Sequence, residues 1–217
     1  MKPIKESVTT GKAKSALLVG LLCVSLPGLA AASSWYLGAG YGSAYSESAD
    51  GNAYGIASQM VSPSIAYDTS YRALSLFGGY RFNRYVALEL AYTDLGTYRL
   101  DALDQSNGAT YSESNKVSAV SIAAIEYFPI NRAFSIFWKL GLASATDSET
   151  CAANTFTCTP HSSIGITPVY GIGGSINLGP AASIRLEYDE YNNIGNAYWD
   201  YTAGSFSNVH VDALFRF

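Results

Sequence analysis

Apolar and polar residues alternate along much of the chain after residue 33. The clearest case is Ser183–Gly195, where three apolar residues alternate with three charged ones. The apolar set is Ile184, Leu186 and Tyr188, and the charged set is Arg185, Glu187 and Asp189. This period of two places the two sets on opposite faces of a β-strand. A soluble sheet would bury the apolar face, whereas a membrane barrel turns that face to lipid and encloses the charges.

The same alternation predicts eight strands of about ten residues each, the length that a tilted strand needs to cross a bilayer. The strands are expected at residues 34–45, 70–80, 85–95, 116–128, 134–145, 164–178, 183–191 and 208–217. No run of about 18 consecutive apolar residues follows the first 32, so no membrane-spanning helix is expected. Any crossing of a membrane by the mature chain is therefore assigned to strands.

The connections between these strands alternate in length. Short turns are expected at 81–84, 129–133 and 177–182, and long polar runs at 46–70, 96–115, 146–163 and 192–207. All long runs then fall on one side of the sheet, as in barrels with short periplasmic turns and long extracellular loops. The predicted fold is all-β: an eight-stranded antiparallel up-and-down transmembrane β-barrel with four long extracellular loops. Its first and last strands should pair, and its interior should be filled by side chains.

Aromatic residues near the strand ends are expected to form girdles at the two membrane interfaces. The predicted girdle residues are Trp35, Tyr36, Tyr80, Tyr85, Tyr92, Tyr127, Tyr188 and Tyr191. The alternative is that aromatic residues are simply common in strands.

Residues 1–32 have the composition of a secretory signal peptide: four lysines, then an apolar run that ends in small residues. We expect cleavage near Ala31 or Ala32 and a single barrel domain at 33–217, with an uncleaved anchor as the alternative. Without residues 1–32 the net charge is about −7, which argues against nucleic-acid partners. Cys151 and Cys158 then remain in one polar run of an exported protein and are expected to form a disulfide rather than a metal site.

Several stretches resemble the OmpA-type transmembrane domain of Gram-negative outer membranes. They are WYLGAG at 35–40, FGGYRFNRYVALELAYTDLG at 77–96, IFWKLG at 136–141 and IRLEYDEYNNIGNA at 184–197. The resemblance implies a monomer in outer-membrane lipid and lipopolysaccharide, inserted by the barrel assembly machinery. Phe215 and Phe217 in the terminal FRF would supply the assembly signal. The peptidoglycan-binding domain of the longer family members is not found here, so cell-wall anchoring is not expected.

The resemblance also implies an ion-pair network that plugs the lumen. Its members would be Glu89, Lys139, Arg185 and Glu187, with Arg185 as the hub between the two glutamates. Where the family pattern has a lysine and a further glutamate, this chain has Ile125 and Ser175. One cation and one anion are lost together, so the predicted quartet is formally neutral and favours a fixed plug over a switch.

Three functions are compatible with these patterns, and none needs a metal or cofactor. The first is an outer-membrane protein with a structural and surface-interaction role, whose loops would hold any extracellular ligand. The second is a narrow or gated ion channel. The third is a lipid A-modifying enzyme built on His161, Ser163 two residues farther on and a carboxylate such as Glu187 or Glu190, although the sequence has no G-x-S-x-G motif.

Overall fold

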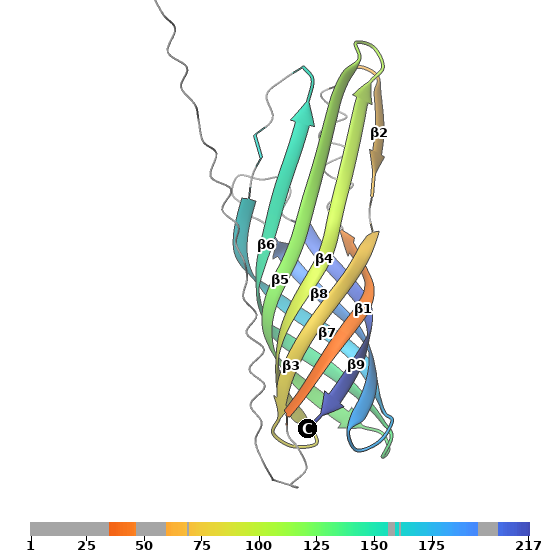
Figure 1. Ribbon diagram of the computed structural model, residues 1–217, viewed down its shortest axis with the longest axis vertical. Coiled ribbons are helices and arrows are strands. Elements are labelled where there is room, and N and C mark those ends of the chain that lie inside the picture. The colour runs from red at the N-terminus through yellow and green to blue at the C-terminus, as the bar shows by residue number, and fades with distance from the viewer. Residues whose placement is uncertain (1–34, 47–59, 69, 156–158, 161, 195–203) are drawn as a thin grey trace, which may run out of the picture. The chain divides into compact units, whose positions relative to one another are not determined.

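The computed structural model describes residues 35–46, 60–68, 70–155, 159–160, 162–194 and 204–217 (Figure 1). The predicted signal peptide, Cys158 and His161 lie outside these residues. Among the described segments, no helix has the length and apolar character needed to cross a bilayer.

The described residues form nine β-strands, eight of which close into a barrel. Their bounds are β1 Trp35–Ser46, β2 Pro63–Tyr67, β3 Ser70–Arg81, β4 Val86–Asp104, β5 Ala109–Pro129, β6 Phe134–Ala153, β7 Ser162–Asn177, β8 Ala182–Ile194 and β9 Gly204–Arg216. Neighbours in the barrel are antiparallel, and β1 pairs with both β3 and β9. The pairing of β1 with β9 confirms the prediction that the first and last barrel strands meet, and the pairing of β4 with β5 completes the ring.

The prediction of a second long loop at residues 96–115 is largely wrong. β4 continues to Asp104 and β5 begins at Ala109, so only a tight turn separates them. A bulge between Asp94 and Gly96 interrupts the pairing; Gly96 has φ 95°, and its N–H donates to Asp94 Oδ1 at 2.9 Å. The polar composition suggested a loop, yet backbone pairing needs no apolar side chains. The strands therefore extend beyond the predicted membrane span, as Figure 1 shows for β4, β5 and β6.

The ninth strand, β2, lies outside the barrel. It pairs with the outer part of β4, so that Pro63 faces Asp104 and Tyr67 faces Leu100. The sequence did not predict this strand, because an alternation of apolar and polar residues cannot be recognised in a segment of only five residues. Its Ile65 packs with Met60 and Tyr111 against Leu100 and Ala102, forming a small apolar cluster.

The two faces of the barrel strands have the inverted polarity that the sequence predicts. Apolar side chains such as Leu76 and Ile172, each 64% exposed, cover the outer surface, while charged side chains are buried inside. Three of the predicted girdle residues do not fit this surface. Tyr36, Tyr127 and Tyr191 are buried in the lumen, because their positions in the alternation point inward.

The lumen side chains form three layers. The turn-side apolar layer comprises Tyr36, Phe77, Ala87, Ala91, Ile125, Tyr127, Phe137 and Leu214. The loop-side apolar layer includes Ala44, Leu95, Tyr98, Val117, Val169, Tyr191, Ile194 and Phe206. Between them lies the charged layer of Glu89, Lys139, Arg185, Glu187, Asp189, His210 and Asp212. Along β9, for example, Leu214 is followed by Asp212, His210, Asn208 and then Phe206 toward the loops.

Candidate functional site

Arg185 is the centre of the charged layer and forms ion pairs with three carboxylates. Its Nη1 lies 2.8 Å from Glu89 Oε2, its Nε 2.9 Å from Asp212 Oδ2 and its Nη2 3.0 Å from Glu187 Oε2. These partners come from β4, β9 and β8 itself. The predicted hub between Glu89 and Glu187 is present in the geometry, and Asp212 is an additional partner.

Lys139 and His210 join the remaining carboxylates into one network. Lys139 Nζ is 2.6 Å from Asp189 Oδ2 and also forms an ion pair with Glu187. His210 lies between two acids, with Nδ1 2.6 Å from Asp212 Oδ1 and Nε2 3.3 Å from Asp189 Oδ2. Every member is at most 4% exposed, so the groups must compensate one another's charge where water is scarce.

The predicted neutral quartet is therefore incomplete. Four carboxylates, two permanent cations and one histidine form the layer, and its formal charge is −1 with His210 protonated or −2 with His210 neutral. The missed residues do have a sequence signal. Asp189 shares a face with Arg185 and Glu187, and His210 and Asp212 alternate with Val209 and Val211.

Aromatic and hydroxyl groups support Arg185 from the turn side. Its guanidinium carbon lies 4.5 Å from the Phe77 ring centre and 5.4 Å from that of Phe137, within the range of cation–π attraction. The Tyr36 hydroxyl donates to Glu89 Oε2 at 3.0 Å. Ile125, which replaces a family lysine, is fully buried in the same apolar layer.

Two glycines provide space for carboxylates of the charged layer. Gly40 is paired with Asp212 and Gly171 with Asp189 across neighbouring strands. A Cβ added at Gly40 would collide with the Asp212 carboxylate, and one at Gly171 would collide with Asp189. Close approach of the acids to the barrel wall therefore requires glycine at both positions.

The other predicted site residues lie away from this layer. Cys151 is near the outer end of β6, and its predicted disulfide with Cys158 stays a prediction, because Cys158 is outside the described residues. Phe215 and Phe217 are each 58% exposed at the short-turn end of the barrel.

The predicted enzyme arrangement is not formed by the residues that the structure describes. Ser162 opens β7, whereas Glu187 is in register with Gly173 and Glu190 with Tyr170, farther along the same strand. At about 3.3 Å per residue, these pairing positions are about 36 Å and 26 Å from Ser162 along β7. Ser163, the serine of the enzyme hypothesis, is only one residue nearer, about 33 Å and 23 Å from the two positions, so neither carboxylate can assist its hydroxyl.

Three groups of the charged layer have ligand atoms close enough to hold a metal ion: Glu187, His210 and Asp212 lie within 4.8 Å of one another. Each already pairs with another member of the layer, since Arg185 contacts both acids and His210 contacts Asp212. A cation would have to displace these contacts, so the arrangement favours an ion-pair network over a metal centre.

A family model described as the OmpA-like transmembrane domain matches residues 30–217. The chain belongs to this family. Outer membrane protein A of Salmonella typhi is 30% identical over 142 residues, 65% of this chain and 39% of that protein. The Shigella flexneri protein is 32% identical over 122 residues, covering 56% and 33%. This chain thus spans less than half the length of either relative.

A solved barrel supports the assignment of the fold. The crystal structure of Neisserial surface protein A has a TM-score of 0.58 at 14% identity and covers 85% of this chain and 98% of that one. Together with the family match, the closed eight-stranded sheet identifies an OmpA-like β-barrel of the Gram-negative outer membrane. Its exposed apolar band accordingly faces lipid.

Proposed function

We propose that this OmpA-like barrel is a structural anchor that presents an interaction surface outside the cell, and that its lumen is a fixed plug. The observation that supports the proposal is the layered interior. Charged side chains fill the middle of the lumen, and an apolar layer covers them on each side. An ion crossing the barrel would meet two apolar barriers and would have to separate buried ion pairs.

The surface role rests on the ordered part of the barrel beyond the membrane. β4, β5 and β6 extend outward as one sheet, and β2 adds a strand to its edge. Loops and strand extensions of this kind carry binding residues in many scaffolds. A catalytic role is not proposed, because Ser163 is far along β7 from the carboxylates that the enzyme hypothesis requires.

Lipopolysaccharide and the barrel assembly machinery are proposed partners. The exposed apolar band would contact lipid chains, and the exposed aromatic rings of Phe215 and Phe217 would be accessible to an assembly factor. These residues lie at the edge that β9 offers until it pairs with β1.

Single-molecule conductance in planar bilayers tests the plug against the channel. The folded monomer is expected to show no steady conductance, and the Lys139→Ala variant is expected to behave in the same way because both apolar layers remain. Heat-modifiable migration on gels serves as the control that each inserted sample is folded. If the monomer shows a steady conductance and Lys139→Ala changes that conductance, the proposal of a plugged lumen is wrong and the channel function is favoured.

A further inference from the structure

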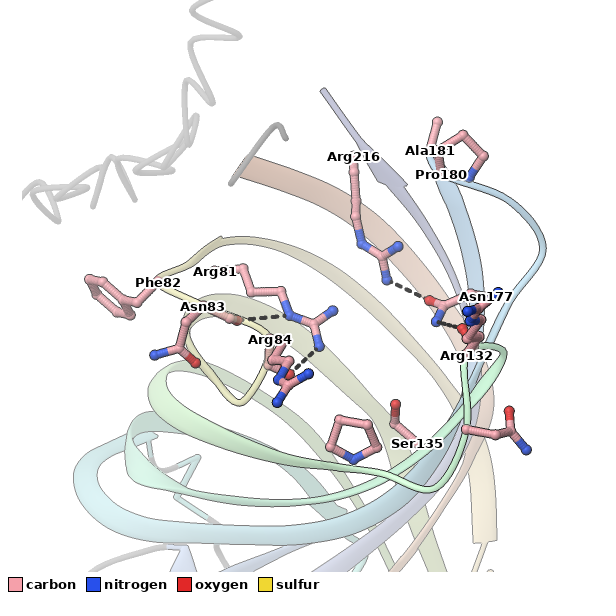
Figure 2. A pocket seen from close by; sticks show the side chains of 12 residues that line it. Arg81, Phe82, Asn83, Arg84, Arg132, Ser135, Asn177, Pro180, Ala181 and Arg216 are labelled. Carbon is pink, nitrogen blue, oxygen red and sulfur yellow. Dashed lines mark hydrogen bonds between the residues drawn. The ribbon is translucent and has the colours of Figure 1, made fainter. Parts of the chain in front are cut away.

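The short-turn end of the barrel contains an open cavity that the plug does not use. Its volume is about 1010 Å³, and its described lining includes four arginines: Arg81, Arg84, Arg132 and Arg216 (Figure 2). They are four of the nine Lys and Arg residues that follow residue 32, so the basic charge of an acidic chain is concentrated here. We call this cavity the arginine mouth.

The arginines reach the mouth from separate elements. Arg81 ends β3, Arg216 ends β9, Arg84 lies in the turn before β4, and Arg132 lies in the turn between β5 and β6. The described lining has no Asp or Glu, and within the described part of the chain none of the four arginines forms an ion pair. Among the residues that the structure describes, the mouth therefore carries a charge of +4 without an ion-pair partner.

Neutral groups hold two of these guanidiniums in place. Arg81 donates to the backbone carbonyls of Asn83 at 3.2 Å and Arg84 at 2.9 Å, and its guanidinium carbon lies 4.3 Å from the Tyr127 ring centre. Arg216 donates to Asn177 Oδ1 at 2.9 Å and Ser183 Oγ at 2.6 Å. Each guanidinium has five N–H donors, and these hydrogen bonds use two on each arginine. Positioned cations with spare donors are suited to bind oxyanions.

We propose that the arginine mouth binds a multiply charged phosphate ligand on the periplasmic side of the membrane. A single carboxylate would leave most of the charge uncompensated, whereas several linked phosphates place many acceptor oxygens and negative charges within one cavity of this size. Guanidinium forks match phosphate oxygens in pairs. Because the short turns face the periplasm in barrels of this class, the ligand would approach from that compartment or from the adjacent lipid headgroups.

Calorimetric titration of sodium tripolyphosphate into the folded full chain in neutral detergent at low salt tests this site. We expect saturable binding with one ligand per barrel that weakens as salt is added, because salt screens exposed charges. The Arg81→Gln/Arg216→Gln variant should bind at least tenfold more weakly. The matched control is Arg72→Gln/Arg99→Gln, which removes the same charge from exposed positions toward the loop end. Its affinity should equal that of the unaltered protein.

The outcomes separate the sources of the anion. Weaker tripolyphosphate binding in micelles that contain phosphatidylglycerol would support the site and identify headgroups as competing ligands; unchanged binding would support a soluble phosphate compound. The proposal is overturned if binding is not saturable, if both double variants lose affinity equally, or if hexaglutamate binds more tightly than tripolyphosphate. A heat-modifiability gel of each variant verifies folding, so lost binding cannot be attributed to unfolding.

Discussion

Arg185 has more ionic partners than any other side chain described in the lumen. It compensates Glu89, Glu187 and Asp212 at once, and the only other permanent cation of the layer, Lys139, contacts Glu187 and Asp189. Loss of the guanidinium would leave buried carboxylates close together without a neutralising group, which is far more costly than loss of a surface ion pair.

Arg185→Ala is expected to destabilise the folded barrel by about 3 kcal/mol, because it leaves buried carboxylates unpaired. Equilibrium unfolding by denaturant in micelles measures this as a lower midpoint. Arg72→Ala at an exposed position of β3 is the control and should change little. An unchanged midpoint for Arg185→Ala would mean that water, rather than Arg185, compensates these acids.

Gly171→Ala should also destabilise the barrel, by about 1–3 kcal/mol, because the new methyl group forces the Asp189 carboxylate away from the wall. Gly179→Ala is the matched control, since a Cβ there meets no atom within 4 Å. The same denaturant unfolding experiment compares them. Equal midpoints for the two variants would show that Asp189 can move without cost.

The four predicted lumen residues came from the resemblance to the OmpA-type domain, and the alternation of each strand places them on its polar face. Partners across the lumen could not be derived in the same way. Contact between Arg185 and Glu89 depends on the heights at which β8 and β4 present their inward residues on opposite sides of the barrel, and those heights follow from strand tilt and register. A stagger of two residues would have placed a different pair in contact.

At the scale of elements, the least predictable part is the outer extension formed by β2 and the β4–β5 hairpin. Asp104 fixes this extension: its carboxylate accepts hydrogen bonds from the N–H groups of Val61 and Ser62 at 3.1 and 3.2 Å and from Ser106 N–H and Oγ at 3.0 and 2.7 Å. Hydrogen bonds between one side chain and a distant backbone segment leave no periodic pattern in the sequence. Composition therefore indicated a loop where strands form.

The Asp104 contacts make the extension sensitive to acid. Hydrogen bonds from Ser106, and then from the Val61 and Ser62 backbone, lower the pKa of Asp104 from 3.8 to about 2. Because the folded-state pKa is depressed, the stabilisation is complete above about pH 4 and is lost as the pH falls toward 2. NMR titration of the Asp104 carboxyl carbon should give a midpoint near 2, with the Val61 amide shift following it. A midpoint near 3.8 would contradict these hydrogen bonds.

At the scale of the whole molecule, strand period, strand number and loop asymmetry were sufficient to predict a closed barrel and its lipid-facing surface. Hydrogen bonding in a bilayer leaves few alternatives for eight amphipathic strands, so the architecture follows even from approximate strand boundaries.

The orientation of the barrel can be tested with epitope insertions. A short epitope placed between Ser106 and Asn107, at the tip of the β4–β5 hairpin, should be reached by antibody on intact cells. The same epitope after Gly179, in the short turn before β8, should be reached only after the outer membrane is permeabilised. Labelling of the Gly179 insertion on intact cells would reverse the orientation and would place the arginine mouth outside the cell.

The contact between Arg185 and Glu89 also bears on the order of events in folding. The two residues are 96 positions apart, and β8 and β4 are not neighbours in the sheet, so their ion pair spans the lumen and forms only when the barrel closes around it. Contacts that form after the folding transition state affect the unfolding rate more than the folding rate. Substitutions in the charged layer should therefore shorten the lifetime of the closed barrel while changing little how quickly it assembles.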